Sequence, residues 1–518
     1  MDSIRLKSFR SLKDTGPIEL KPITFLLGQN SSGKSTFLRS FALLKQSINV
    51  RAREPFLWVG ELVDFGGISE TLSTFSEEKK VTFEYEFTIP NLAALLRGPG
   101  LGPPPPRYGD RAAVSISEVV CGNDHEIAFE YIIEIKDSLL EFSLSREGKF
   151  CSFKINKTCY VDLVKDRIIA KVWRGPLPTF SHISAGSAFD ELDDAEEGKS
   201  FSAAVDKFIK ARSHGRTGID KRNNAAWRLK RFPFDLLRVV RYPATGDTVW
   251  HKTVSSWTTE TPEFIHFKNL ILGARFPDIM GVINDYTLGV LENFRYITPL
   301  RANAERYYRK QGLAVDELDP KGTNFALFLD NMTQGDRQEF ANWCEQFFGV
   351  SILVEKEGGH LSLFIIPKDS TDSKVNIADT GFGFSQMFPI LAQLWTAQKT
   401  KDSRKKTKTT IPLIFAIEQP ELHLHPKLQA NLADVFISSI HAANEAGIDL
   451  RLIVETHSEY LINRVGNLIS AERFPSSEAS VLIFERESYS EETKIKRASY
   501  SREGYLENWP YGFFEPGI

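Results

Sequence analysis

The sequence predicts an α/β fold, because a buried strand, a phosphate loop and a helix follow one another near its beginning. Residues 23–27 (ITFLL) are typical of a buried strand, and residues 36–46 carry apolar side chains at helical spacing. Between them, residues 28–36 read GQNSSGKST and fit the pattern G-x-x-x-x-G-K-[ST] at every fixed position. A chance glycine-rich turn is the alternative, but here the strand and helix that a phosphate loop requires lie on its two sides.

The chemistry of a phosphate loop assigns roles to these residues. Glycines let the backbone wrap closely, so that N–H groups and the helix N-terminus face phosphate oxygens. Lys34 would reach the β- and γ-phosphates of a nucleotide, and the Ser35 hydroxyl would ligate Mg²⁺. The candidate nucleotide-binding residues are Gly28, Gln29, Asn30, Ser31, Ser32, Gly33, Lys34, Ser35 and Thr36.

The composition is that of an ordinary globular protein. Of 518 residues, 42% are hydrophobic and 25% charged, and the formal net charge is -3. This charge does not point to nucleic acid, although a local basic patch would matter more than the total. We find no apolar signal core, no run long enough to cross a bilayer and no C-x-x-C pair among the cysteines. We therefore expect a cytoplasmic protein with reduced thiols.

We expect four segments along the chain. Residues 1–90 would form strand-rich structure around the phosphate loop, and residues 91–190 would continue it as a β-rich lobe with a Pro-rich loop. Residues 191–370 are interpreted as a mainly helical insertion, and residues 371–518 return to strands and helices with the remaining motifs. No internal repeat or long heptad run is present in the sequence.

A second apolar strand, residues 411–417, ends in an acidic turn that begins with Glu418. An acid delivered beside a phosphate loop orders Mg²⁺ or its water shell, and we assign that role to Glu418. A buried strand followed by an ordinary acidic turn is the alternative. It would be favoured if the motif stood alone, but not beside a phosphate loop.

A third apolar strand, residues 452–454, leads into Glu455, Thr456 and His457. Ligands bind at the carboxyl edge of parallel sheets, so we expect His457 to sense the γ-phosphate there. A histidine that is merely satisfied in the core is the alternative.

The segment 379–386 (DTGFGFSQ) precedes an apolar helix and resembles an anion site at a helix N-terminus. One nucleotide does not need two such sites from the same subunit. We therefore expect Gly383, Ser385 and Gln386 to cap the nucleotide of a second subunit.

Together these motifs resemble the ABC-type ATPases, the class that includes RecF, SMC and the overcoming-lysogenisation-defect (OLD) ATPases. The resemblance covers residues 1–90 and 370–518. It implies an ABC-type P-loop ATPase head of α/β fold, assembled from both chain ends, with an inserted and mainly helical middle domain. It also implies that two heads sandwich two ATP molecules with Mg²⁺, so that the protein is a homodimer or a higher oligomer.

Two short segments resemble segments of bacterial defence ATPases. They are EQPELHLHP at residues 418–426 and PLRA at residues 299–302. In particular, these segments resemble the ATPase subunit of the Septu anti-phage system, which is also found with some retrons. This resemblance implies a regulatory subunit that controls a separate HNH-type nuclease or a toxin. After His457 we find no D-x-D cluster, so we expect no nuclease domain in the chain itself.

One residue departs from the ABC-type pattern. Many heads have a catalytic glutamate after the acidic strand end, whereas this chain has Gln419. An amide orients water but takes no proton, and general-base help is worth about 10²–10⁴ in rate. We expect tight ATP binding and slow hydrolysis, with Glu421 or His457 as alternative bases.

Two further hypotheses about the function remain. The chain is a stand-alone RecF-like DNA-repair ATPase, or it is a scaffold that binds nucleotide without hydrolysing it. The first would need contacts to DNA or RNA. A solvated basic face is the usual explanation of clustered cations, but phosphate neutralisation by such residues supplies most non-specific affinity. The candidate nucleic-acid contacts are Arg212, Arg216, Lys221, Arg222, Arg228, Lys230 and Arg231.

Overall fold

The computed structural model describes residues 1–509 with short gaps, and these residues divide into two compact units. The gaps are residues 53, 97–110, 123–126, 166, 183–199, 242–246, 300, 313–314, 316, 370–372, 400–410 and 489. The insertion unit comprises residues 1–9, 16–18 and 43–291, and the head unit comprises residues 10–15, 19–42 and 292–518. Every motif of the predicted nucleotide site lies in the head unit, whereas the Pro-rich loop at 98–106 lies outside the described residues.

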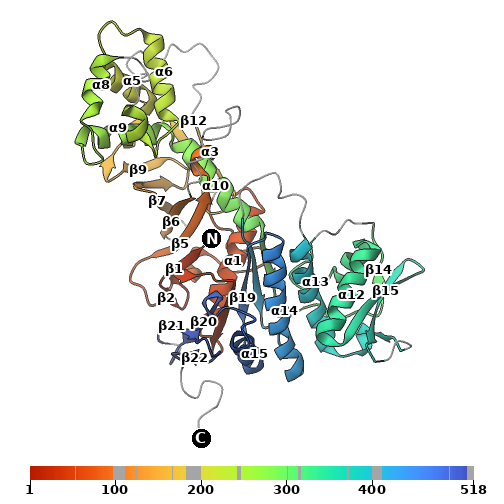
Figure 1. Ribbon diagram of the computed structural model, residues 1–518. Helices are drawn as coiled ribbons and strands as arrows, with labels where there is room; N and C mark the ends of the chain where they lie inside the picture. Colours follow the sequence, from red (N-terminus) through yellow and green to blue (C-terminus); the bar gives the residue numbers. More distant parts are fainter. Residues whose placement is uncertain are drawn as a thin grey trace. The chain divides into compact units, whose positions relative to one another are not determined.

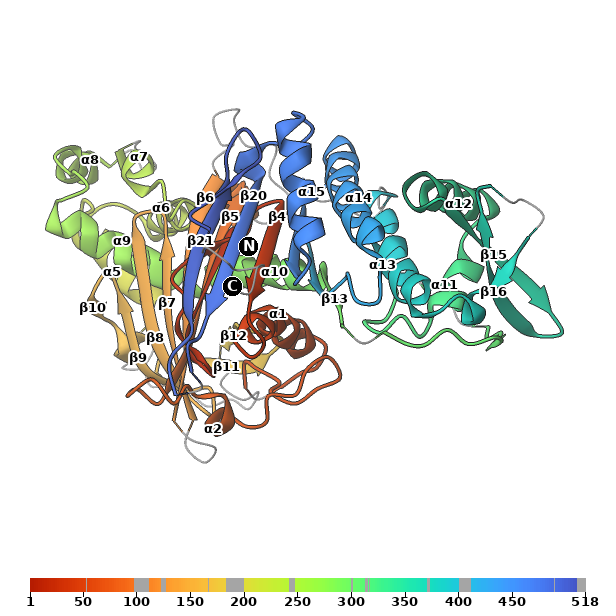
Figure 2. The same cartoon turned by 90° about the horizontal axis from the view of Figure 1, so that it is seen from below.

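The head unit is built on a seven-stranded sheet, in the order β13-β18-β19-β4-β20-β21-β22. Pairing is parallel from β13 to β20 and antiparallel beyond it. All residues of β4 and β18 are buried, as expected for parallel strands covered on both faces. Figure 2 shows β4 beside β20. The strands are β4 (Ile23–Gly28), β13 (Phe294–Ile297), β18 (Leu413–Glu418), β19 (Leu450–Glu455), β20 (Ala479–Glu485), β21 (Lys494–Tyr500) and β22 (Leu506–Glu507).

Helices follow the strands of this sheet and pack against one another. The helix after the phosphate loop is α1 (Lys34–Ile48), as the spacing predicted, and it begins at the loop lysine. Helix α13 packs on α14, and α14 packs on α15 (Figure 1). The other head helices are α11 (Phe325–Asn331), α12 (Gln334–Phe348), α13 (Phe382–Lys399), α14 (Pro426–Glu445) and α15 (Glu459–Ser470), with 3₁₀ turns η2 (Ile377–Asp379) and η4 (Ser476–Glu478).

A second, four-stranded sheet of the head unit lies in a region that we expected to be helical. Its strands are β14 (Tyr308–Arg309), β15 (Val350–Glu357), β16 (His360–Pro367) and β17 (Val375–Asn376). The expected boundary at residue 370 therefore differs from the boundary between the units, which falls at 291/292. The physical reason is the parallel pairing of β13 with β18, which ties residues 294–297 into the head sheet.

The insertion unit carries an antiparallel sheet in the order β10-β9-β8-β7-β6-β5-β1. We expected all of residues 1–90 in the head, but residues 1–9, 16–18 and 43–90 belong to this unit, because β5 pairs with β1 and β6. The strands predicted by alternation at 4–9 and 81–87 are confirmed. The strands of this sheet are β1 (Ser3–Phe9), β5 (Lys80–Pro90), β6 (Arg111–Gly122), β7 (Ile127–Ile135), β8 (Ser138–Ser145), β9 (Phe150–Ile155) and β10 (Thr158–Cys159). Strands β11 (Ile168–Trp173) and β12 (Pro178–His182) pair with each other in a separate two-stranded sheet.

The helical part of the insertion unit follows its strands in the chain. It begins at Phe201 and ends at Glu292, so the expected helical character of this stretch is confirmed. In the part of the chain that the structure describes, no helix combines the length and apolar character needed to cross a bilayer. The helices are α5 (Phe201–Ala211), α6 (Ile219–Lys230), α7 (Leu236–Arg241), α8 (Thr248–Ser255), α9 (Pro262–Ala274) and α10 (Phe276–Glu292).

Candidate nucleotide-binding site

The backbone of the phosphate loop requires glycine at both of its fixed glycine positions. Gly28 ends β4 with φ 147°, and a Cβ atom there would lie 2.2 Å from the carbonyl oxygen of Phe484. Gly33 has φ 100°, and its Cβ would lie 2.8 Å from Ser11 Oγ. Ser31 between them also has positive φ, at 63°. A side chain at either glycine would therefore push the loop out of shape.

Lys34 is held over this loop. Its side chain is buried, and Nζ donates to the carbonyl oxygens of Gly28 at 2.9 Å and Gln29 at 2.7 Å. Burial lowers the pKa of Lys34, whereas the charges of Glu455 and Glu421 raise it. The loop thus presents a cation and a helix N-terminus to the same space, which suits phosphate oxygens.

A cavity of about 390 Å³ opens in front of the loop. Gln419 and Glu455 line it from the C-terminal part of the chain, and Arg10 and Arg486 add two further cations. The predicted loop residues that line it are Asn30, Ser31, Gly33, Lys34, Ser35 and Thr36.

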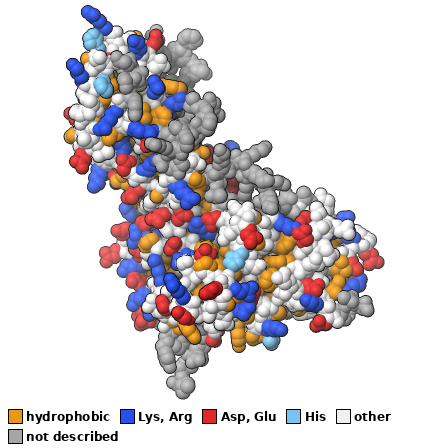
Figure 3. All heavy atoms as spheres, in the orientation of Figure 1, with side chains coloured by type: hydrophobic (Ala, Val, Ile, Leu, Met, Phe, Trp, Pro, Cys, Tyr) orange, Lys and Arg blue, Asp and Glu red, His pale blue; other side chains and the backbone are white. Residues whose placement is uncertain are grey.

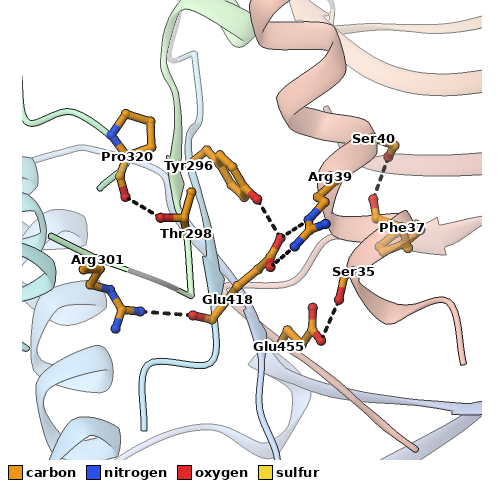
Figure 4. Close-up of polar contacts among 10 residues, drawn as sticks. All are labelled: Ser35, Phe37, Arg39, Ser40, Tyr296, Thr298, Arg301, Pro320, Glu418 and Glu455. Carbon is orange, nitrogen blue, oxygen red and sulfur yellow. Dashed lines mark hydrogen bonds and ion pairs between the residues drawn. The ribbon is translucent and has the colours of Figure 1, made fainter. Parts of the chain in front are cut away.

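Two carboxylates end the neighbouring strands β18 and β19. Glu418 and Glu455 are register partners in this parallel pair, and both are 2% exposed. The Ser35 hydroxyl donates to Glu455 Oε1 at 2.9 Å (Figure 4). Burial raises the pKa of Glu455 to about 7, and the charge of Glu418 adds to this, while the bond from Ser35 and the charge of Lys34 oppose it.

Glu418 has different partners. Arg39 Nε donates to its Oε1 at 2.8 Å and Arg39 Nη2 to its Oε2 at 2.9 Å. The Tyr296 hydroxyl donates to Oε1 at 2.7 Å, and Arg301 Nη2 donates to the backbone carbonyl at 3.0 Å (Figure 4). The hydrogen bond from Arg39 to Glu418 raises the pKa of Arg39. Figure 4 shows Glu418 directed toward Arg39 and Tyr296, and Glu455 toward Ser35.

The predicted trans signature lies at the start of α13. Ser385 is 7% exposed, and its hydroxyl donates to the carbonyl oxygen of Phe382 at 2.9 Å. Gln386 exchanges two bonds with Arg301, since its Oε1 accepts from Arg301 N at 3.1 Å and its Nε2 donates to Arg301 O at 3.2 Å. A Cβ at Gly383 would lie 3.0 Å from the His423 carbonyl. The segment is thereby tied to the loop that carries Arg301.

Gln419, Glu421 and His457 meet at the same sheet edge. Gln419 has φ 44°, an uncommon conformation for a residue with a side chain, and its N–H donates to the Glu455 carbonyl at 2.8 Å. Glu421 Oε1 accepts from the His457 N–H at 2.7 Å. Burial raises the pKa of Glu421, and burial together with the charge of Lys34 lowers the pKa of His457.

The candidate nucleic-acid contacts lie elsewhere, in the helical part of the insertion unit. Trp227 on α6 is 58% exposed, with the Arg231 guanidinium 4.1 Å from its ring centre. Figure 3 shows Lys and Arg side chains on the visible face of this part. Arg212 stacks on Phe208 at 3.7 Å, and burial lowers the pKa of Lys230. Exposed candidates are Arg216, Lys221 and Arg228, and half-buried ones are Arg212, Arg222, Lys230 and Arg231.

Several residues of the site were not predicted. Arg39, Tyr296 and Arg301 surround Glu418. No motif marked Arg39 or Tyr296, and Arg301 lies in the PLRA segment, to which we had assigned no role in the site. Glu455 carried a signal that we did not use, because it ends an apolar strand just as Glu418 does.

Comparison with known proteins agrees with this architecture. Residues 1–173 and 302–462 match the family described as "AAA ATPase domain". The match covers more than half of the chain, so this protein belongs to that family of ATPases. The predicted α/β P-loop head assembled from both chain ends, with a helical segment between them, is thus confirmed.

Among solved structures, the chain is similar to an "SMC head domain from Thermotoga maritima" at 10% identity. The alignment covers 96% of this chain and 97% of that chain, with a TM-score of 0.31. The search of curated proteins returned no match.

Proposed function

We propose that this chain binds ATP with Mg²⁺, hydrolyses it slowly, and acts as the regulatory subunit of a prokaryotic anti-phage defence complex. The observation that carries the slow hydrolysis is the position of Gln419, which lines the cavity together with Lys34 and Ser35. An amide at this place orients a water molecule but accepts no proton from it. The defence role is supported by the resemblance of the segments at 418–426 and 299–302 to those of bacterial defence ATPases.

The residues at the cavity fit a bound Mg²⁺ ion. Ser35 offers a hydroxyl, and the Glu455 oxygen that does not bond to Ser35 is buried without a partner among the described residues. Mg²⁺ is usually held by one or two carboxylates together with phosphate oxygens and waters. When bound, it would neutralise charge on the β- and γ-phosphates. Glu418 was predicted as the acidic ligand, and it ends the strand beside that of Glu455.

Two residues stand as alternative bases. Glu421 uses one oxygen to hold the His457 backbone, and its other oxygen is buried without a partner in the described part of the chain. Burial and the charge of Lys34 lower the pKa of His457, which favours the neutral imidazole that a base requires. Neither is among the residues that line the cavity, so each would serve only after a rearrangement that brings it to the attacking water, which fits a low rate.

In this proposal ATP closes two heads on each other. Gly383 and Ser385 would contact the γ-phosphate held by the other subunit, and Gln386 would carry that contact to Arg301. ATP favours the closed dimer by its higher affinity for that arrangement. A separate HNH-type nuclease or toxin would be held or released by the change.

Phosphate release by the purified chain tests the catalytic part. We expect slow release by the wild type, none by Lys34→Ala, and a rise of about 10²-fold or more in Gln419→Glu. Fast wild-type release that disappears in Lys34→Ala would contradict slow hydrolysis and indicate another base. The defence role is tested by phage plaque counts on cells that carry this gene with its neighbours, with Lys34→Ala as the matched control. Equal plaque counts with wild type and variant would refute it.

A second candidate function is supported by the exposed Trp227 and the cations around it. Aromatic side chains stack on the bases of single strands, and Arg and Lys neutralise the phosphates. We propose that α6 contacts nucleic acid, as a stand-alone RecF-like repair ATPase would require. The third hypothesis is a scaffold that binds nucleotide without hydrolysing it. ATP that stays bound through purification, without phosphate release, would favour this hypothesis.

A further inference from the structure

The two carboxylates at the ends of β18 and β19 are not equivalent. They are register partners and equally buried, but Glu455 lines the cavity in front of the phosphate loop, and Glu418 is not among the lining residues. The difference comes from the donors that each one meets. These donors decide which carboxylate is available to a cation.

Both oxygens of Glu418 are already occupied. Oε1 accepts from Arg39 Nε and from the Tyr296 hydroxyl, and Oε2 accepts from Arg39 Nη2. Two parallel N–H···O bonds between a guanidinium and a carboxylate are among the strongest in proteins. A metal ion at Glu418 would have to displace this guanidinium and leave its positive charge beside the ion. The surroundings of Glu418 therefore oppose metal binding.

Glu455 has the opposite surroundings. Its Oε1 receives one neutral hydrogen bond, from Ser35, and its Oε2 is buried without a hydrogen-bond partner in the described residues. A buried carboxylate without full compensation is costly, and a cation removes that cost. Ser35 is also the loop residue whose hydroxyl ligates Mg²⁺ in phosphate-loop proteins. The hydroxyl and the carboxylate therefore already lie together where the ion would bind.

We infer that Glu455 supplies the carboxylate of the Mg²⁺ site, and that Glu418, whose oxygens Arg39 and Tyr296 occupy, does not bind the ion. The inference rests on the proposed binding of Mg²⁺ and ATP, and it replaces the role that the sequence suggested for Glu418. The ion pair with Arg39 joins the end of β18 to α1, the helix that carries Ser35. This ion pair would thus keep Glu418 away from the ion.

Nucleotide affinity with and without metal tests this inference without any turnover. ATP binding is measured by calorimetry in Mg²⁺ and in EDTA for the wild type, Glu455→Gln and the matched Glu418→Gln. Loss of an outer-shell partner costs a metal site about 10–100-fold in affinity, and we expect Glu455→Gln, which removes a direct ligand, to lose at least that much of the affinity gained from Mg²⁺. Its affinity in EDTA should not be reduced. Glu418→Gln should retain that gain. If Glu418→Gln lost the Mg²⁺-dependent increase in ATP affinity, or if Glu455→Gln kept it, the assignment of Glu455 as the Mg²⁺ ligand would be overturned.

Two additions keep the outcomes separate. If either Gln variant does not fold, Glu455→Asp and Glu418→Asp replace the pair, since each keeps its charge and withdraws the carboxylate by one methylene. The Glu455→Asp protein should then lose part of the Mg²⁺-dependent gain and Glu418→Asp none, and the reverse order would overturn the inference. A wild type that binds ATP in neither buffer would refute the proposed function itself. A wild type that binds equally in both would refute only the metal site.

Discussion

Arg39 of α1 and Glu418 at the end of β18 form a two-pronged ion pair, with N···O distances of 2.8 and 2.9 Å. Glu418 is 2% exposed in its side chain, whereas that of Arg39 is 42% exposed. The pair therefore stands at the border of the head core. The carboxylate depends on the guanidinium far more than the guanidinium depends on the carboxylate.

Removal of the Arg39 guanidinium should destabilise the protein, because the buried Glu418 carboxylate then lacks its cationic partner. Arg39→Met leaves a buried carboxylate with Tyr296 as its remaining side-chain donor, and we expect a loss of about 2 kcal/mol in the free energy of unfolding, below the range for fully buried pairs. The double variant Arg39→Met/Glu418→Gln should recover part of this loss, because no unpaired charge remains. Urea unfolding of both proteins measures the difference. Equal losses in the single and double variants would contradict the dependence.

The phosphate loop should tolerate no side chain at Gly28. In Gly28→Ala the new Cβ meets the Phe484 carbonyl, in addition to a backbone cost of about 1–3 kcal/mol for a side chain at φ 147°. Gly349→Ala is the matched control, since Gly349 also has positive φ, at 68°, and its Cβ would meet nothing within 4 Å. We expect a larger fall in melting temperature in Gly28→Ala and loss of ATP binding only there. Similar melting temperatures would argue against the close approach of β20.

Glu118 in the insertion unit should make stability depend on pH. It is fully buried, Tyr131 donates to its Oε1 at 3.4 Å, and burial raises its pKa well above the ordinary value. When the pKa of a carboxyl is higher in the folded protein than in the unfolded chain, its contribution to stability is complete below the unfolded-state pKa. This contribution is lost as the pH rises through the folded-state pKa.

Glu118→Gln should remove this dependence. Its melting temperature should exceed that of the wild type near pH 8 and approach it near pH 4, where the wild-type carboxyl is protonated in the folded state and mostly protonated in the unfolded state. Thermal unfolding across that range measures the effect. A difference that stays constant with pH would show that Glu118 is not the titrating group.

Ser385 should matter for dimer closure and not for binding by one subunit. Ser385→Ala should weaken ATP-dependent dimerisation, measured by sedimentation, and leave ATP affinity of the monomer unchanged. Ser255→Ala is the matched control, because the Ser255 hydroxyl makes the same bond, at 2.9 Å to the carbonyl three residues earlier. Equal loss of monomer affinity in Ser385→Ala and Lys34→Ala would refute the contact across subunits.

The exposed face of α6 should respond to salt if it binds nucleic acid. Lys221→Ala should weaken binding of single-stranded DNA and reduce the slope of log affinity against log salt by about 1. Trp227→Ala should cost about 1–3 kcal/mol with little change in that slope. Lys252→Ala on α8 serves as an exposed control. Unchanged binding in both α6 variants would leave this face as an ordinary solvated surface.

Local sequence patterns were enough to predict the phosphate loop, whereas contacts between residues far apart in the sequence were not predicted. Gly28, Gly33 and Lys34 lie within one short segment whose spacing dictates its shape, so the loop, β4 and α1 could be read directly. Arg39 and Glu418 are 379 positions apart, and Ser35 and Glu455 are 420 apart. These contacts depend on the strand order β18-β19-β4, which hydrophobic periodicity does not encode.

The same limit explains the division into units. Apolar and polar residues alternate in β5 as they do in any half-buried strand, so the sequence did not reveal which sheet would receive it. Pairing with β1 and β6 places it in the insertion unit. Likewise β13 is only four residues long, too short for its pattern to show that it joins the head sheet.

The position of β4 in the sheet has a consequence for how the protein is made. Its six residues are buried between β19 and β20, which emerge from the ribosome more than 400 residues later. The phosphate loop is translated more than 400 residues before these two strands, so β4 lacks both neighbours until β20 has been made. A nascent or truncated chain would carry an apolar strand with open edges, which is prone to aggregation. Nucleotide binding by this protein thus reports that translation has passed β20.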